Sequence, residues 1–161
     1  MQFRLPPMPM SVYEQAEALL MVVGAAILGG LIGTEREWRS KPAGIRTHIL
    51  VAVSAALVVI LGPPLVELYS IGSPRETIRN EPLSILHAII LGISFIGAGT
   101  VLKNLEAKEI LNLTTAATLL FAGTVGVLVG TKLYPLAVAS TLLILFLNVA
   151  LQFLEKKMPR E

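Results

Sequence analysis

Five long apolar runs, separated by short charged segments, limit what this chain can fold into. Each run holds about 16 to 22 residues, and about 20 residues at 1.5 Å per residue cross the hydrocarbon core of a bilayer. Charged residues make up only 15% of the chain, against about 25% in an ordinary soluble domain. The sequence therefore predicts an all-α fold, a polytopic transmembrane helical bundle in one domain, residues 1–161. The predicted spans are residues 13–34, 46–61, 83–102, 114–130 and 136–153.

The distribution of Lys and Arg predicts the orientation of these spans. With five crossings, nine basic residues fall on the side that holds the 34–47 hinge, the 103–112 connection and the C-terminal tail. Four fall on the other side. Since cytoplasmic segments carry the excess of Lys and Arg, we expect the N-terminus outside and the C-terminus in the cytoplasm. The expected location is the cell inner membrane, with several passes.

Several kinds of chemistry have no basis in the sequence. The absence of cysteine excludes a disulfide frame and thiolate metal sites. A formal net charge of only +2 indicates no nucleic-acid partner. No nucleophile with a neighbouring base is evident, so we predict no enzyme and no evident cofactor.

The hinge between the first two runs holds the densest charges. Glu35 and Arg39 are four residues apart, as are Glu37 and Lys41, a spacing that pairs charges along one helix. Arg46 lies at the start of the next run, within reach of the end of the first. This position suggests a Glu35–Arg46 pair that fixes the crossing of the two helices. Whether these charges are architectural or contact a ligand or partner stays open.

Other polar groups in or beside the spans are functional candidates because burying them in lipid is costly. His87 could relay a proton or be a satisfied interior histidine, whereas His48 is expected near the interface, where it is easier to solvate. Glu35 and Glu81 are the candidate metal ligands, but they are expected on opposite sides of the membrane. The candidate functional residues are Glu35, Arg36, Arg46, Thr47, Glu81, His87, Thr114 and Thr115, and Asn148 lies inside the fifth span.

Small residues at helical spacing predict where the helices pack closely. We expect most of these contacts within one chain, and a homodimer interface is the main alternative. The residues are Gly29, Gly33, Gly92, Gly97, Gly99, Ala122, Gly126 and Gly130.

Three motifs resemble those of the MgtC/SapB family of bacterial membrane proteins. The hinge reads Gly29-Gly30-x-Ile32-Gly33-x-Glu35-Arg36, followed by Lys41-Pro42-Ala43-Gly44-Ile45-Arg46-Thr47-His48. The second motif, residues 92–100 (GISFIGAGT), is similar to the family signature GIGFLGAG. The third, residues 113–118, reads LTTAAT. The motifs stand in the family's order and cover roughly residues 25 to 130.

The chain also departs from the family pattern. The family's Asp-Pro before the third span is Glu81-Pro82 here, and the arginine that follows is replaced by Ser84. The middle glycine of the signature is Ser94. MgtC-type members carry a soluble C-terminal domain, so this chain resembles the shorter, membrane-only branch.

The resemblance implies a role in magnesium homeostasis and adaptation to low Mg²⁺. The first hypothesis is a membrane protein that acts through membrane-protein partners. The alternative is an oligomeric transporter of Mg²⁺ or another small cation, with Glu35, Glu81 and His87 along the route. Mg²⁺ is thus a possible ligand or substrate, and the expected partners are the lipid bilayer and a second copy of the chain, a dimer being favoured.

Overall fold

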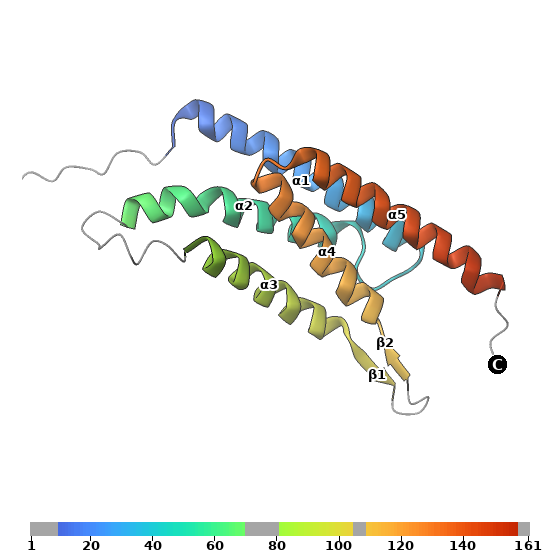
Figure 1. Cartoon of the computed structure of the whole chain (residues 1–161). Helices are drawn as coiled ribbons and strands as arrows, with labels where there is room; N and C mark the ends of the chain where they lie inside the picture. Colours follow the sequence, from blue (N-terminus) through green and yellow to red (C-terminus); the bar gives the residue numbers. More distant parts are fainter. Residues whose placement is uncertain (1–9, 70–80, 105–108, 158–161) are drawn as a thin grey trace, which may run out of the picture.

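A computed structural model describes residues 10–69, 81–104 and 109–157. Five helices and a short antiparallel ribbon of two strands follow one another along the chain (Figure 1). The elements are α1 (Val12–Trp38), α2 (Ile45–Tyr69), α3 (Glu81–Thr100), β1 (Leu102–Asn104), β2 (Glu109–Leu111), α4 (Leu113–Gly130) and α5 (Tyr134–Lys157). All five helices are long and apolar enough to cross a membrane, which confirms the predicted all-α transmembrane fold. The strand ribbon was not predicted.

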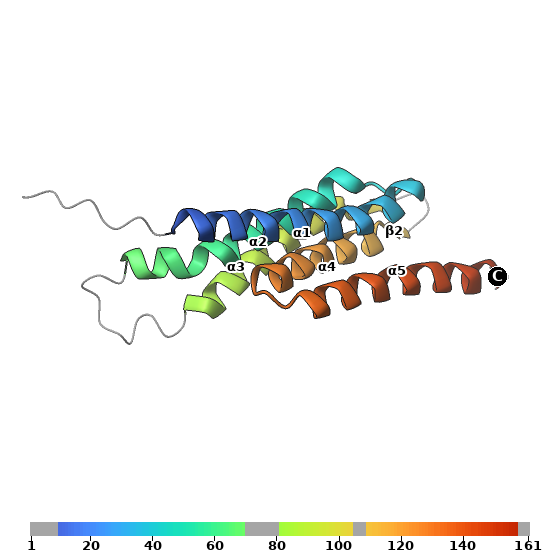
Figure 2. The ribbon, with the colours of Figure 1, turned by 90° about the horizontal axis from the view of Figure 1, so that it is seen from above.

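Successive helices run in opposite directions (Figures 1 and 2). The α1–α2 turn, the strand ribbon and the end of α5 lie at one end of the bundle, called here the hinge end. The start of α1 and the α4–α5 turn lie at the opposite end. The helices thus alternate as the count of basic residues assumed, and the cytoplasmic position of the hinge end stays a prediction.

Helix α4 is the centre of the bundle and contacts each of the other four helices. Within its span 44% of the residues are buried, compared with 17% in α3 and 11% in α5. Its core side chains are small or of medium size, including Ala122, Val125 and Val129. Such side chains let neighbouring helices approach closely, which is the main way helices associate in lipid.

Helix α2 extends beyond its predicted end at residue 61. Gly62, Pro63 and Pro64 follow this predicted end and form a sequence that usually breaks a helix, but the helix continues to Tyr69 with both prolines inside. Proline has a φ angle close to that of a helix, but it lacks the N–H donor and its ring crowds the carbonyl group four residues earlier. Proline is tolerated in membrane helices because neighbouring helices and water can satisfy the freed backbone groups. Gly62 also packs here, since a Cβ at this position would lie 2.7 Å from Cδ1 of Ile85 in α3.

An ion pair joins two elements at the end opposite the hinge. Nζ of Lys132, in the α4–α5 turn, lies 2.9 Å from Oε1 of Glu17 in α1. The neighbouring carboxylate raises the pKa of Lys132. Both side chains are more than half exposed, so this pair adds little stability.

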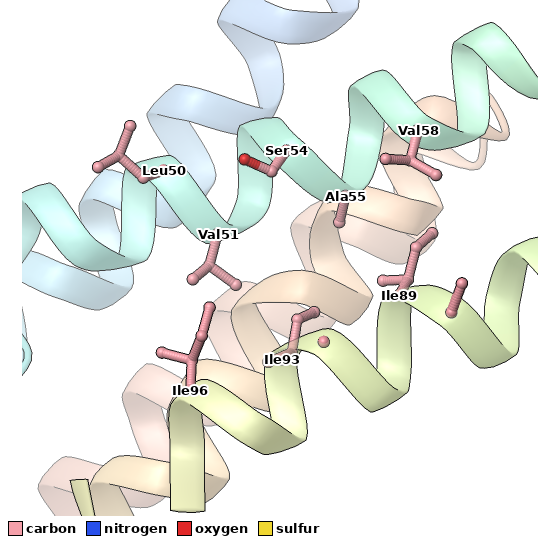
Figure 3. A pocket seen from close by; sticks show the side chains of 10 residues that line it. Leu50, Val51, Ser54, Ala55, Val58, Ile89, Ile93 and Ile96 are labelled. Atoms are coloured by element: carbon pink, nitrogen blue, oxygen red, sulfur yellow. The ribbon is translucent and has the colours of Figure 1, made fainter. Parts of the chain in front are cut away.

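An apolar groove of about 290 Å³ separates the middle parts of α2 and α3 (Figure 3). Its walls include Leu50, Ser54 and Val58 from α2 and Ile89, Gly92 and Ile96 from α3. The groove shows that these two helices pack less closely than α2 packs on α4.

Candidate functional site

Two glycines let α1 and α2 touch at the hinge end. A Cβ at Gly33 would lie 2.6 Å from Cα of Ile45, and a Cβ at Gly29 would lie 2.7 Å from the backbone oxygen of His48. Neither position has room for a side chain. The glycine spacing of α1 therefore places the first turns of α2 directly against the last turns of α1.

Arg36 is the largest fully buried side chain in the described part of the chain, with 2% of its surface exposed. It points from α1 toward α4, where its Nη2 donates a hydrogen bond of 3.1 Å to Oγ1 of Thr115. Its Nε is buried and has no hydrogen-bond partner among the described residues. A buried guanidinium is stable only where such contacts compensate for its lost hydration, so this bond fixes α1 relative to α4.

Glu35 connects α1 to α5. Its Oε1 lies 2.5 Å from Nε of Arg39, and its Oε2 accepts a 3.0 Å hydrogen bond from Nδ2 of Asn148. Arg39 in turn donates from Nη2 to the backbone oxygen of Asn148 at 3.0 Å. The side chains of Glu35 and Arg39 are only 11% and 17% exposed. The three residues therefore form a closed set of contacts between the last turns of two helices.

His48 lies inside the bundle rather than at the interface where it was expected. None of its surface is exposed, and its Nδ1 lies 2.9 Å from the backbone oxygen of Gly44. A carbonyl oxygen only accepts, so Nδ1 carries the hydrogen and Nε2 is an acceptor in the neutral ring. This Nε2 is buried without a described partner. The close approach at Gly29 explains the burial, because it leaves no space for water between α1 and α2.

The hinge itself is a tight turn closed by Glu37. Ser40 adopts a positive φ of 52°, and the backbone N–H groups of Ser40 and Lys41 donate to the backbone oxygens of Glu37 and Arg36. The Glu37 carboxylate accepts a 2.9 Å hydrogen bond from the backbone N–H of Ile45. Glu37 thus caps the first turn of α2, where free N–H groups favour a carboxylate.

Two of the charge pairs expected from the sequence are wrong. Arg46 is exposed and forms no ion pair within the described residues, so it does not meet Glu35. Lys41 is also exposed, and its expected partner Glu37 binds a backbone N–H instead. The pair between Glu35 and Arg39 is present.

The remaining polar candidates are not gathered at this site. Thr114 is exposed although its neighbour Thr115 is buried, and Thr47 is partly buried on α2. Glu81 is the first residue of α3, at the opposite end of the bundle, and its side chain lies outside the described part. His87, on the same helix, is exposed. In the residues that the structure describes, no three His, Cys, Asp or Glu side chains come close enough to hold a metal ion.

The small residues predicted for helix packing divide into two groups. The first group packs on neighbouring helices. Ala122 is fully buried, and Gly126 lies against the backbone oxygen of Ala52. A Cβ at Gly130 would lie 3.0 Å from the backbone oxygen of Ala56. Gly97 faces Ala116 of α4, where a Cβ would lie 3.4 Å from the alanine Cβ. For Gly92 and Gly99 the prediction of packing within one chain is wrong, because a Cβ at either position would meet nothing within 4 Å. Both glycines lie away from the packed face of α3.

The site is therefore a polar cluster between α1, α2, α4 and α5, referred to below as the hinge-end cluster. Its members are Glu35, Arg36, Arg39, His48, Thr115 and Asn148. It contains two guanidinium groups and one carboxylate, so its field favours anionic groups over cations. Nothing in it pairs a nucleophile with a base, and apart from the contact between His48 and Gly44 its side-chain hydrogen bonds join different helices.

Sequence reasoning did not place Arg39, His48 and Asn148 in one site. The only signals were a charge four residues from Glu35 and one amide inside an otherwise apolar span. Asn148 is 113 residues away from Glu35, so no local spacing could connect them.

We expect Thr115→Val to destabilise the protein by about 1.5–3 kcal/mol, because a buried charged donor loses its partner. Thr114→Val is the matched control, since it is the same substitution one residue earlier, at a position that is exposed. We expect it to stay within about 0.5 kcal/mol. The measurement is unfolding in mixed detergent micelles followed by circular dichroism. Equal effects of the two substitutions would contradict the Arg36–Thr115 contact.

Comparison with known proteins matches residues 22–157 to the MgtC family. The chain is 37% identical to the MgtC protein of Salmonella typhimurium strain LT2 over 134 residues, which is 83% of this chain and 52% of that protein. It is 39% identical to the MgtC protein of Brucella abortus strain 2308 over 137 residues, 85% of this chain and 52% of the relative. An uncharacterized protein of Synechocystis is 37% identical over 139 residues, 86% of this chain and 54% of that protein. The chain thus spans about half the length of these relatives, and no solved structure matches it.

Proposed function

Because the chain belongs to the MgtC family, we propose that this multi-pass membrane protein serves magnesium homeostasis and adaptation to low Mg²⁺. In this proposal it lies in the bacterial inner membrane, acts through membrane-protein partners and performs no catalytic step. The family match and the five spans support the membrane assignment. The relatives are about twice as long, so the proposal concerns only the part of them that this chain matches.

The proposal rests on one observation: the charged groups of the hinge-end cluster are already engaged in contacts within the protein. Glu35 is bound by Arg39 and Asn148, and Arg36 is bound by Thr115. A transported cation would need to displace these contacts and to pass two guanidinium groups. Like charges repel strongly in a low-dielectric interior, so a divalent cation is disfavoured there.

The coordination chemistry of Mg²⁺ agrees with a role through partners. Mg²⁺ requires an octahedral set of oxygen ligands and gives up its water reluctantly. Glu35, one of the two candidate ligands, already has both carboxylate oxygens in contact with Arg39 and Asn148. Releasing it for a metal ion would break the connection between α1 and α5.

Two measurements on the same protein test the proposal. In a bacterial host that lacks its own MgtC-type protein and grows poorly at low Mg²⁺, we expect expression of the chain to restore growth. In vesicles with a Mg²⁺-sensitive dye inside, we expect the purified chain to give no flux above protein-free vesicles, with folding verified by circular dichroism. Flux that is lost in Glu35→Ala or Glu81→Ala would support the transporter instead. Failure to restore growth would contradict the role in magnesium homeostasis.

A further inference from the structure

Arg46 presents a free guanidinium at the hinge end of α2. Its side chain is exposed and has no hydrogen bond or ion pair within the described residues. Arg36 and Arg39 differ from it, because both turn inward and bind neighbouring helices. Trp38, at the end of α1, is 86% exposed, and tryptophan prefers the headgroup level of a membrane. The hinge end therefore lies at that level, and the long side chain of Arg46 can extend to the lipid phosphates.

The apolar groove between α2 and α3 begins one helical turn after Arg46. Leu50 is the groove residue of α2 nearest the hinge, and residues four apart share one face of a helix. The groove extends along α2 from Leu50 to Val58 and along α3 from Ala88 to Ile96. Each stretch rises by about 12 Å, which fits within one leaflet, half of a hydrocarbon core about 30 Å thick. The groove thus leads from the level of Arg46 toward the middle of the bilayer.

Small residues keep this groove open (Figure 3). Gly92 lines it, and a Cβ at this position would meet nothing within 4 Å. Ala55 and Ala88 also line it, and Ser54 contributes the one polar side chain among the lining residues. Gly92 packs on no other helix in the described part of the chain, but it leaves room in the groove for an apolar chain.

The size of the groove limits what can occupy it. Its volume is about 290 Å³. An α-helix about 10 Å wide would occupy roughly 900 Å³ over a length of about 12 Å. The groove therefore admits a narrow flexible chain, and not a helix of another protein. In the hydrocarbon region of a bilayer, the narrow flexible chains are the acyl chains of lipids.

We propose that the groove and Arg46 together bind one anionic phospholipid, with an acyl chain between α2 and α3 and the phosphate on Arg46. The planar guanidinium of arginine can donate two parallel hydrogen bonds to a phosphate group. Residues 34–47 contain four basic residues and two glutamates, so their net charge attracts an anionic headgroup. The same charge repels the ammonium group of a zwitterionic headgroup, which therefore binds less tightly.

The opposite end of the bundle offers a different environment. A cavity of about 350 Å³ there includes Lys132, but Glu14 and Glu17 line it as well. Lys132 is already paired with Glu17. Two carboxylates beside one paired lysine do not favour a phosphate, so the proposed lipid site is specific to the hinge end.

Native mass spectrometry of the purified chain tests the proposal, because it counts bound lipids one by one. The chain in detergent micelles is titrated with phosphatidylglycerol and, separately, with phosphatidylcholine of the same acyl chains. We expect one phosphatidylglycerol molecule to bind about five-fold more tightly than phosphatidylcholine, the effect of one basic residue at a membrane surface. Glycerol phosphate has the phosphate without acyl chains, and we expect it not to displace the lipid. Displacement by glycerol phosphate would mean a phosphate site without a bound chain and would overturn the proposal.

Substitutions at the headgroup position test the role of Arg46. We expect Arg46→Gln to weaken phosphatidylglycerol binding about five-fold and to leave phosphatidylcholine binding nearly unchanged. Lys41→Gln is the matched control, since it removes one exposed positive charge from the same hinge at a position away from the groove. We expect it to have a much smaller effect. Equal losses in the two variants would indicate diffuse attraction to the hinge surface and would contradict the site.

Substitutions in the groove test the position of the acyl chain. Gly92→Leu and Ser54→Leu fill the groove from opposite walls, and we expect each to weaken the binding of both lipids. Two variants are used so that a folding defect in one, detected by circular dichroism, leaves the other as a test. Unchanged binding in the folded variants would place the acyl chain elsewhere and would overturn the proposal.

Discussion

Gly126→Ala is expected to lower the free energy of unfolding by about 3 kcal/mol, because α4 loses its close contact with α2. A Cβ at position 126 would collide with the backbone oxygen and Cα of Ala52. Backbone atoms cannot move alone, so the two helices would have to separate along their length. Since α4 contacts each of the other four helices, the separation would disturb the whole bundle.

The same substitution at Gly92 provides the control. A Cβ there would meet nothing within 4 Å, and alanine is a better helix former than glycine by about 1 kcal/mol. We expect Gly92→Ala to be as stable as the natural protein or slightly more so. Unfolding of both variants in mixed micelles, followed by circular dichroism, gives the comparison. Equal stabilities for the two variants would contradict the packing of α4 on α2.

Glu35→Ala is expected to destabilise the protein by about 3 kcal/mol, because it breaks a mostly buried ion pair from one side. Arg39 would lose its carboxylate, Asn148 would lose its acceptor, and two guanidinium groups would remain near each other. Both side chains of the pair are less than one-fifth exposed, so water would compensate only partly.

Arg46→Ala is the control for Glu35→Ala. Arg46 also lies near the hinge, but its side chain is exposed and has no ion pair among the described residues. We expect a change within about 0.5 kcal/mol, as for an ordinary surface position. A large loss of stability in Arg46→Ala would mean that Arg46 supports the hinge after all.

The five spans could be predicted because lipid leaves the backbone no other solution. Every backbone N–H and C=O group in a single span must find its partner within the chain, so a long apolar run indicates a helix. The predicted end of α2 at residue 61 is wrong because Pro63 and Pro64, which would break a helix in a soluble protein, lie inside this membrane helix. In this bundle they lie within the helix, and adjacent Gly62 packs on α3.

The site was harder to predict, since its contacts join distant parts of the chain. The spacing of Glu35 and Arg39 is local, and that pair could be predicted from one helix. Asn148 comes from the last helix, and no periodicity reports which helix lies beside which. His48 was expected near water because it follows the hinge closely, but the packing at Gly29 buries it.

Glu35 joins α1 to α5 through Asn148, and a double-mutant cycle can measure this connection. The cycle compares Glu35→Ala, Asn148→Ala and the double variant. A second cycle compares Glu35→Ala, Arg46→Ala and their double variant in the same way. We expect a coupling energy of about 1–3 kcal/mol between Glu35 and Asn148, and none between Glu35 and Arg46. Coupling to Arg46 without coupling to Asn148 would show that the charges hold the hinge together and do not connect it to α5.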